Sequence, residues 1–499
     1  MSIINRTMYP VQNSMNLISK MQDRFATLQT QLATGQKASN LAEMGSDRYF
    51  DLSIRSRMSR IEGYKGSIGM VNMRLEVFDQ IIGRLDKVEA TARGAMSPSN
   101  YGSSNINFGT VPSLARSNLD EVISLLNTDV DGRHLFAGGE VGKRPVETIT
   151  AILDGAGGKA GFKQVAAERL AADQGAGMGR LTLTPPAANV VALAEDGSHP
   201  FGMKLSSLTS ASAGLTLTPP SGGAPRSLSV EVTAQPLNGE TVTFGLTMPD
   251  GTEEQIVLRA VDGPPQAGEF QIGADVNATA LHLSNALSGA LTKMSNTELV
   301  GASNFAAADN FFHGQNGTVQ RVQGTPATAT VLVDADPTTT VIWYKGEDAA
   351  NARETVKARV DDSANVAYGA QANESGPLAL IKSLAVVAIQ SFSNSDTTSE
   401  GRFDAVATRN YSRLSETHNG ESGSIEMLGV ELGNVRANVD SIAKRQDGYK
   451  AQLEGLLEGI ESVSKEEVAM EILALQTRLQ ASFQATSLVA SLSLVNYLK

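Results

Sequence analysis

The feature that most constrains the fold is a long apolar seam near the end of the chain. Apolar residues recur there at spacings of three and four over more than five heptads, and Gln446 fills the one polar slot. A seam this narrow and this long predicts a helix that lies along another helix. The seam positions are Ile425, Leu428, Leu432, Val435, Val439, Ile442, Tyr449, Leu453, Leu456, Ile460 and Val463.

A second C-terminal helix is predicted from about 465 to 497. Ser464 followed by Glu467 is a capping-box pattern, in which both side chains satisfy free amide groups at the start of a helix. The early part of this helix has one apolar face, whereas residues 487–498 are apolar nearly all round. Since such an end cannot be left in water, we expect it to bury itself against another subunit. The early face comprises Val468, Ile472, Leu475 and Leu479, and the later residues include Leu488, Leu492, Val495 and Leu498.

The N-terminal part mirrors this pattern. A short apolar run ends near Gly35, and a longer run follows a break at 45–47. We expect the two chain ends to pair, so that the longer runs form the seam of a helical rod, although an ordinary helical bundle would explain the seams as well. Residues 112–128 predict one more helix. The short run is Met21, Phe25, Leu28 and Leu32, and the long run is Ile54, Met58, Ile61, Tyr64, Ile68, Val71, Leu75, Phe78, Ile82 and Leu85.

The middle of the chain differs in composition from both ends. Residues 145–365 are rich in Gly, Ala, Thr, Val and Pro and poor in Lys, and they alternate in the manner of strands. Leu-Thr-Leu-Thr-Pro-Pro occurs at 181–186 and again at 215–220, a weak sign of internal duplication. The predicted elements are a hairpin of 241–247 and 255–258, a strand pair of 327–333 and 339–345, and a helix at 277–294.

The predicted fold is therefore mainly α with an inserted β-rich domain. The long N- and C-terminal helices pair into a discontinuous helical rod. The predicted parts are terminal helices at 1–35 and 466–499, a coiled-coil-like rod at 36–144 and 366–465, and an inserted β-rich outer domain at 145–365.

The sequence offers no candidate active site. It has no Cys, which excludes disulfides and thiol chemistry, and its five His have no second ligand at helical spacing. We therefore predict no catalytic, metal-binding or cofactor-binding residue and no enzymatic activity. The net charge of −12 argues against a nucleic-acid partner. The first 21 residues lack the apolar core of a signal peptide, and the run 378–389 is too short to span a bilayer.

Short motifs at both ends resemble the flagellin superfamily. The segment Leu-Ala-Thr-Gly-Gln-Lys at 32–37, followed by Asp47, is similar to the N-terminal segment of flagellins. The run from Asp131 to Gly139, with its Asp-Gly-x-x-Leu-Phe-x-Gly pattern, resembles more specifically the hook–filament junction proteins of this superfamily. The Ser-Leu and Tyr-Leu pattern at 491–498 is similar to their C-terminal end, and the Ile-Ala-Asn-Gln of filament flagellins is absent.

The resemblance implies a structural subunit of the bacterial flagellum at the hook–filament junction. The long middle, some 220 residues, keeps a filament flagellin as the alternative, and a non-flagellar coiled-coil adhesin or secretion tip protein is a third reading. Implied partners are hook-associated proteins, flagellin, further copies of the chain, the flagellar export apparatus and a cytosolic export chaperone. The chain would be secreted without a cleaved signal peptide. The residues expected to mediate polymerisation are Met21, Phe25, Leu28, Leu32, Leu475, Leu479, Leu488, Leu492, Val495 and Leu498.

Overall fold

The computed structural model describes the backbone of residues 8–96, 108–313, 318–393 and 395–497. Within these residues, the side chains from 12 to 489 are described, apart from Phe108. About 54% of the chain is helical, and several small sheets complete a fold that is mainly α with some β. The chain forms two compact units. The first comprises residues 1–71, 359–365 and 437–499, and the second comprises 72–358 and 366–436.

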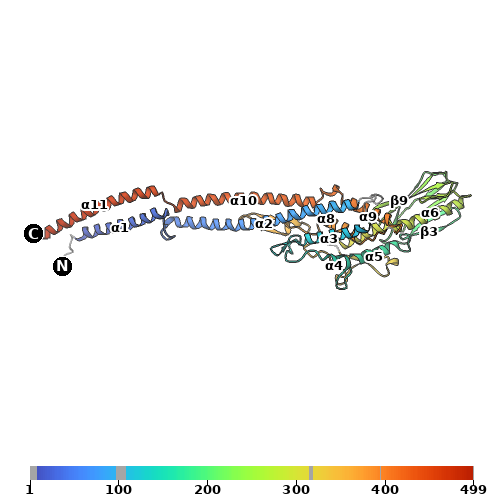
Figure 1. Cartoon of the computed structure of the whole chain (residues 1–499), viewed down its shortest axis with the longest axis horizontal. Coiled ribbons are helices and arrows are strands. Elements are labelled where there is room, and N and C mark those ends of the chain that lie inside the picture. Colours follow the sequence, from blue (N-terminus) through green and yellow to red (C-terminus); the bar gives the residue numbers. More distant parts are fainter. Residues whose placement is uncertain (1–7, 97–107, 314–317, 394, 498–499) are drawn as a thin grey trace. The chain divides into compact units, whose positions relative to one another are not determined.

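The first unit is built from long helices that lie side by side in pairs (Figure 1). The helix α1 ends immediately before Gly35, as the sequence predicts, because Gly35 has a φ of +73° and closes the last turn by donating its N–H to Gln31 O. Two helices, α2 and α10, contribute residues to both units. The helices are α1 (Met8–Thr34), α2 (Arg48–Ala95), α10 (Ile425–Glu461) and α11 (Lys465–Tyr497), with the short 3₁₀ helix η1 (Gly45–Asp47) before α2.

The start of α11 is capped by Ser464. The Ser464 hydroxyl accepts a hydrogen bond from Glu467 N–H at 3.3 Å, as the capping pattern predicts. The carboxylate that contacts the Ser464 hydroxyl belongs to Glu466 and not to Glu467. The predicted cap is therefore right in its first contact and wrong in its second.

Within the first unit, α2 and α10 run antiparallel. Their ion pairs join Arg55 to Glu461, Glu62 to Lys450 and Lys65 to Asp447. Residue numbers therefore rise along α2 as they fall along α10. Such exposed pairs contribute little to stability individually, because solvent screens them, but they fix the direction of the pairing. In the second unit a side chain at Gly429 would lie 3.5 Å from Cγ2 of Ile82, so the two helices are also neighbours there.

The polar slot of the C-terminal seam has a specific partner. Gln446 is buried, and its amide donates to the carbonyl of Val360 at 3.4 Å. Nearby, Arg445 pairs with Asp361 at 2.9 Å, and the Tyr64 hydroxyl donates to Asp362. Residues 359–365, which the prediction assigned to the outer domain, therefore belong to the helical unit.

The helical part of the second unit surrounds α7 (Glu298–Phe311). Nearly every residue of α7 from Leu299 to Ala308 is buried, and it packs against α5, α8 and α9. Because α7 lies in the middle of the sequence and α8 and α9 follow it near the C-terminal end, residues 145–365 are not a separate insertion. The remaining helices are α3 (Val111–Leu126), α4 (Ile149–Asp154), α5 (Phe162–Gln174), α8 (Ser375–Ala388) and α9 (Ser399–Arg413), with 3₁₀ turns η3 (Phe108–Thr110), η4 (Pro326–Thr328), η5 (Ala352–Thr355) and η6 (Glu416–His418).

The Asp-Gly-x-x-Leu-Phe motif forms a tight hairpin. Strands β1 (Asp129–Val130) and β2 (Arg133–His134) pair antiparallel around Asp131 and Gly132, both of which have positive φ, as a two-residue hairpin turn requires. The chain then turns inward, and the ring of Phe136 is fully buried 5.2 Å from the ring of Phe78 on α2. The motif thus anchors the end of α3 to α2 within the second unit.

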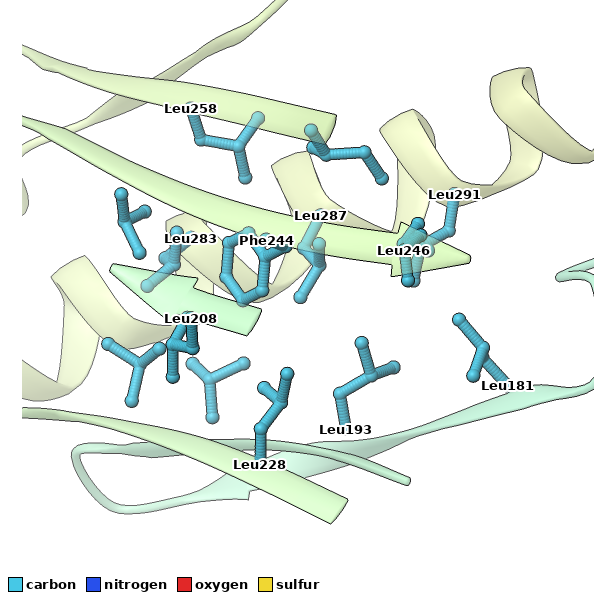
Figure 2. Close-up of a cluster of buried hydrophobic side chains, with 14 of the residues drawn as sticks. Leu181, Leu193, Leu208, Leu228, Phe244, Leu246, Leu258, Leu283, Leu287 and Leu291 are labelled. Carbon is cyan, nitrogen blue, oxygen red and sulfur yellow. The ribbon is translucent and has the colours of Figure 1, made fainter. Parts of the chain in front are cut away.

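Two four-stranded sheets and α6 (Val276–Asn296) enclose one apolar core (Figure 2). The predicted hairpin and the predicted helix at 277–294 are confirmed as β8–β9 and α6. The core includes Phe244 and Leu258 from one sheet, Leu193 and Leu228 from the other, and Leu287 from α6. The first sheet has the order β3 (Leu181–Ala187), β4 (Val190–Glu195), β7 (Ser227–Val232), β6 (Leu215–Thr218), and the second β10 (Glu269–Gln271), β9 (Glu253–Val261), β8 (Thr241–Thr247), β5 (Lys204–Ser210).

The repeated Leu-Thr-Leu-Thr-Pro-Pro segments form the two edge strands of the same sheet, β3 and β6. Pro lacks a backbone donor, so it is tolerated at such an edge and not in the centre of a sheet. The shared sequence therefore reflects a shared edge position.

The predicted strand pair of 327–333 and 339–345 is wrong. Instead β12 (Leu332–Asp334) pairs antiparallel with β11 (Gln320–Val322), and 339–345 makes only isolated bridges through Thr340 and Tyr344. This stretch is held by its aromatic side chains, since Trp343 packs edge-on against Phe312. A last two-stranded sheet is formed by β13 (Lys357–Arg359) and β14 (Asn365–Ala367).

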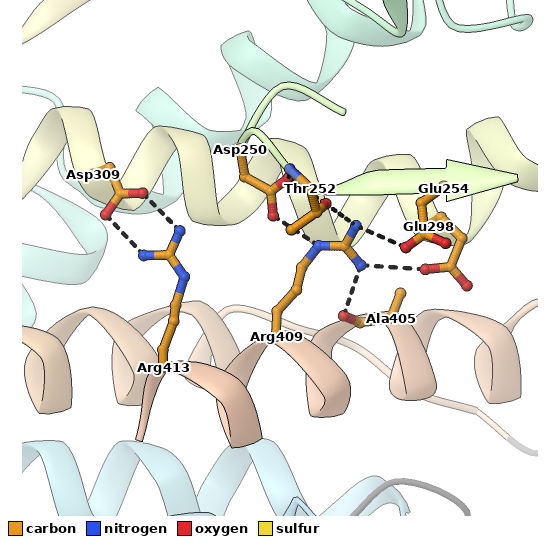
Figure 3. A network of polar contacts seen from close by, with 8 residues as sticks. All are labelled: Asp250, Thr252, Glu254, Glu298, Asp309, Ala405, Arg409 and Arg413. Atoms are coloured by element: carbon orange, nitrogen blue, oxygen red, sulfur yellow. Dashed lines mark hydrogen bonds and ion pairs between the residues drawn. The ribbon is translucent and has the colours of Figure 1, made fainter. Parts of the chain in front are cut away.

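A buried ion-pair network joins α9 to the β8–β9 turn and to α7 (Figure 3). Arg409 donates to Asp250 Oδ2 at 2.8 Å, to Glu298 Oε2 at 3.2 Å and to Thr252 Oγ1 at 2.8 Å, and both Arg409 and Asp250 are almost fully buried. Burial raises the pKa of Glu298 above its ordinary value, and the nearby Glu254 adds to this. A second pair, Arg413 with Asp309, is bidentate.

Candidate assembly surface

The helices α1 and α11 pack against each other along one apolar strip. Leu28, Val468 and Leu475 are buried at its centre, and other apolar side chains pack around them. The pair is closed at one end by backbone hydrogen bonds from Lys37 N to Glu461 O and from Val463 N to Gly35 O. The surrounding side chains are Met21, Phe25, Leu32, Val463, Ile472 and Leu479.

This strip corrects part of the predicted polymerisation set. Leu28, at 0% exposure, and Leu475 are buried within one chain and so do not lie on an outer surface. Met21, Phe25, Leu32 and Leu479 flank them in the same intramolecular strip. The prediction assumed that each terminal helix lacks a local partner, whereas each is the partner of the other.

A second set of apolar side chains on this pair stays in water, and we call it the terminal apolar surface. Leu488 is 63% exposed and Leu473 is 64% exposed, although both are large apolar residues. By helical periodicity, Met470, Leu473 and Leu488 lie on the side of α11 opposite the buried strip. The surface comprises Met15, Leu17, Met470, Leu473, Phe483, Leu488 and Val489.

The sequence prediction found only one described member of the terminal apolar surface, Leu488. Leu492 and Val495 belong to α11, but their side chains lie outside those described, and Leu498 lies outside the described residues altogether. Met470 and Leu473 were missed because they fall off the three-and-four spacing of the seam, whereas Phe483 continues that spacing four residues after Leu479 and was left out of the predicted set. An apolar residue at a position where the pattern expects a polar one is the signal that would have found Met470 and Leu473.

Exposed aromatic residues lie at the start of α2 in the same unit. Tyr49 is 77% exposed and Phe50 is 60% exposed, with their rings edge to face at 5.9 Å. Leu52 and Leu41 are exposed as well. Large aromatic side chains are concentrated at the energetic centres of protein interfaces, and these residues add to the exposed apolar surface of the first unit.

Two ion pairs lie on or next to the terminal pair. Arg24 on α1 pairs with Glu471 on α11 at 3.0 Å, and Lys37 pairs with Asp47 at 2.5 Å in the loop before α2. The hydrogen bond from Lys37 holds the pKa of Asp47 below its ordinary value. The pKa of Glu62 is lowered in the same way by Lys450.

The predicted rod seam is buried or partly buried except at Tyr449, which is 48% exposed, and at Leu456. Leu456 is 59% exposed, so its assignment to the seam is wrong, and the neighbouring Leu457 is partly buried instead. A straight α-helix has 3.6 residues per turn, so a strict heptad count drifts off the buried face over several turns. The other positions are buried or partly buried: Ile54, Ile61, Ile68, Leu75, Ile82, Leu428, Leu432, Val435, Val439, Ile442, Leu453 and Ile460.

The described residues were also searched for metal sites, membrane-spanning helices and a phosphate-binding loop. Among them, no group of three or more His, Cys, Asp or Glu side chains is arranged to hold a metal ion. Nor does any described helix combine the length and the apolar character needed to cross a bilayer. The glycine-rich segment from Gly155 to Gly161 forms a tight turn between α4 and α5, in which a side chain at either glycine would clash with backbone atoms.

Comparison with known protein families and with curated proteins gives no match.

Proposed function

We propose that the protein is a structural subunit of the bacterial flagellum that assembles at the hook–filament junction. The observation that carries the proposal is the terminal apolar surface, which adds exposed Met, Leu and Phe side chains to a helix pair already packed on its inner side. Fully burying one such side chain contributes about 1.5–3 kcal/mol before the ordering entropy is subtracted. Several together are enough to hold a subunit in a polymer.

The mode of assembly follows from the asymmetry of this surface. The terminal apolar surface and the exposed Tyr49 and Phe50 consist of different residues, so a copy that contacts one through the other forms a head-to-tail contact. Repeated head-to-tail contacts generate an open helical array when the rotation does not close. The chain contains no Cys, so non-covalent contacts carry the mechanical load. The sheets and α6 are the part we assign to the outside of such an array.

The junction assignment rests on the resemblance of two motifs. The Asp-Gly-x-x-Leu-Phe segment has a role in the fold, because its hairpin buries Phe136 against α2. By the same resemblance, the partners are hook-associated proteins, flagellin, the export apparatus and a cytosolic chaperone, and the chain reaches the exterior without a cleaved signal peptide.

A filament flagellin is the second candidate. It is favoured by the size of the middle region, which holds two four-stranded sheets and the helices α5, α6 and α7. A subunit at a junction a few copies long does not need a large outer part, whereas a filament subunit presents such a part along the whole surface.

Immunogold labelling of intact flagella from the native bacterium tests both candidates. We expect one narrow band of label where the hook meets the filament. Continuous label along the filament would replace the junction with the flagellin assignment. Absence of label from flagella, with label elsewhere on the cell surface, would contradict both.

A further inference from the structure

A groove of about 560 Å³ lies between strand β9 and helix α6 in the second unit. Ile256, Val257 and Leu258 line its strand side, and Ala286, Gly289, Ala290, Lys293 and Met294 line its helix side. The inward side chains of the strand and of the helix belong to the apolar core seen in Figure 2, so the groove has a rigid floor.

The strand side of this groove is a sheet edge that the turn before β10 borders at Val257, where a side chain at Gly268 would lie 3.8 Å from Val257 O, and that is open beyond this turn. Strand β9 spans Glu253–Val261, but its outer neighbour β10 pairs only with 259–261. Ala260 N–H is donated to Glu240 on the side of β8, whereas Arg259 N–H is donated outward to Gly268. Since the hydrogen-bonding direction alternates along a strand, the N–H and C=O groups of Gln255 and Val257 face outward as well. No described strand pairs with them on that side, and Val257 is 49% exposed.

The helix side leaves room for another strand. Ala286 and Ala290 are small, and a side chain built at Gly289 would meet no atom within 4 Å. Glycine inside a helix costs about 1 kcal/mol relative to Ala, and no contact of this chain explains its presence at this position. An added strand needs about 4.8 Å beside β9, and small residues along the facing helix provide that space.

The charges at the groove leave one cation without a partner. Glu269 is paired with Arg259, and Glu298 is paired with the buried Arg409. Lys293, on the last turn of α6, forms no ion pair with any described residue. The free charge that a ligand meets in the groove is therefore positive.

We propose that this groove binds an extended peptide by β-strand addition. The peptide supplies main-chain hydrogen bonds to Gln255 and Val257, small apolar side chains toward Ile256 and Ala290, and a carboxylate toward Lys293. An open strand edge selects an extended backbone, the apolar floor selects alternate apolar side chains, and the unpaired cation selects the carboxylate. This binding site is independent of the proposed role in the flagellum, because it lies outside the helices that carry that role.

The test uses the full chain with labelled methyl groups of Ala, Ile, Leu, Met and Val. The probe is the hexapeptide acetyl-Ser-Val-Thr-Val-Ser-Ala with a free carboxylate, compared with its C-terminal amide and with a version N-methylated at alternate residues. We expect saturable methyl shifts at Ile256, Val257, Ala290 and Met294. The N-methylated peptide, which lacks the backbone donors, should produce none.

Three variants separate binding from folding. Gly289→Leu fills the groove without a clash and should weaken binding at least about tenfold. Val257→Pro removes an outward N–H that the sheet does not use and should also abolish binding, since Pro is tolerated at a sheet edge. Lys293→Ala should weaken the carboxylate peptide about two- to fivefold and leave the amide peptide unchanged. Thermal melting checks that each variant stays folded.

Three results would overturn the proposal. The first is the absence of methyl shifts at the highest soluble peptide concentration. The second is equal binding of the N-methylated peptide or of a folded Gly289→Leu variant. The third is a shift of the groove methyls with protein concentration alone, which would assign the groove to a second copy of the chain.

Discussion

The terminal helix pair leaves large apolar side chains exposed, whereas the two-sheet region buries them. The sheets and α6 bury large side chains such as Phe244 and Leu287 on every side of one core. In the terminal pair, α1 and α11 bury Leu28 and Leu475 along a single strip and leave residues such as Leu473 in water. One chain thus contains a region whose apolar core is closed and a region that keeps large apolar side chains exposed.

The physical reason is the number of layers. Two sheets and a helix close around a core, whereas two helices share only one line of contact, so the remaining circumference of each must be polar or covered by something else. The sequence of α11 places several large apolar residues among the polar ones on that circumference. The difference separates a region that buries its apolar side chains from a region that leaves several of them exposed.

The largest expected effect lies in the second unit. Arg409→Ala leaves the buried Asp250 carboxylate without its ion-pair partner, although Thr252 still donates to its other oxygen, and removing one member of a buried ion pair costs about 3–5 kcal/mol. Denaturant unfolding followed by the fluorescence of Trp343, which belongs to this unit, measures the change.

Arg413→Ala is the matched control for this substitution. Asp309 is partly exposed and keeps Lys382 at 3.1 Å, so the loss should be about 1 kcal/mol. Equal losses for the two variants would show that the burial of Asp250 does not set the cost.

The second effect concerns the terminal pair. Leu28→Ala should destabilise the contact of α1 with α11 by about 2 kcal/mol, the lower end for buried Leu, because the strip is bordered by water. Hydrogen exchange should accelerate in both helices and stay unchanged in β8 and β9. Leu473→Ala, at an exposed position of α11, is the control. It should change neither the stability of the contact between α1 and α11 nor the rates of hydrogen exchange. Faster exchange in the sheets of the Leu28 variant would mean that the two regions do not unfold separately.

The helices of both regions were predictable from sequence because their pattern is local. Alternating spacings of three and four located α2, α10 and α11, and the positive φ of Gly35 ended α1 where the motif indicated. The error at Leu456 came from counting heptads where the helix turns every 3.6 residues.

The other parts were not predictable, because they depend on residues distant in sequence. In the sequence, Arg409 is one polar residue in the pattern of an amphipathic helix. Its partners Asp250 and Glu298 are distant in sequence and come close to it only in the fold. The contact of Gln446 with Val360 is of the same kind. The polymerisation set was partly wrong because periodicity shows which residues are apolar and does not show whether the partner is another helix of the chain or another subunit.

The smallest expected effect is on the pH dependence of stability, to which the two units contribute with opposite signs. Glu89 of the second unit lines a cavity of about 310 Å³ with Glu426, and burial together with that neighbouring carboxylate raises its pKa to about 7. Because the folded state holds this proton more tightly than the unfolded state, stability falls as pH rises from about 4.5 to 7. Glu89→Gln should remove this loss. It should raise the free energy of unfolding by on the order of 1 kcal/mol at pH 8, after solvent screening, and leave it unchanged at pH 4.

Melting curves of the wild type and the Glu89→Gln variant at the two pH values measure this effect. In the first unit, Asp47 and Glu62 have lowered pKa values, so their contribution has the opposite sign and is lost as pH falls. A variant that gained as much at pH 4 as at pH 8 would show that Glu89 acts through packing and not through its charge.

The most direct test asks whether the terminal apolar surface joins subunits. The triple variant Leu473→Ser, Phe483→Ser, Leu488→Ser changes only exposed side chains of α11, and the matched control Gln476→Ser, Gln480→Ser, Gln484→Ser changes exposed polar ones on the same helix. The measurement is the amount of protein recovered with sheared flagella relative to the amount free in the medium. We expect the triple variant to melt like the wild type and to be exported, but to be recovered with flagella at least about tenfold less, while the control behaves as wild type. Wild-type recovery of the folded triple variant would contradict the claim that this surface is the site of assembly.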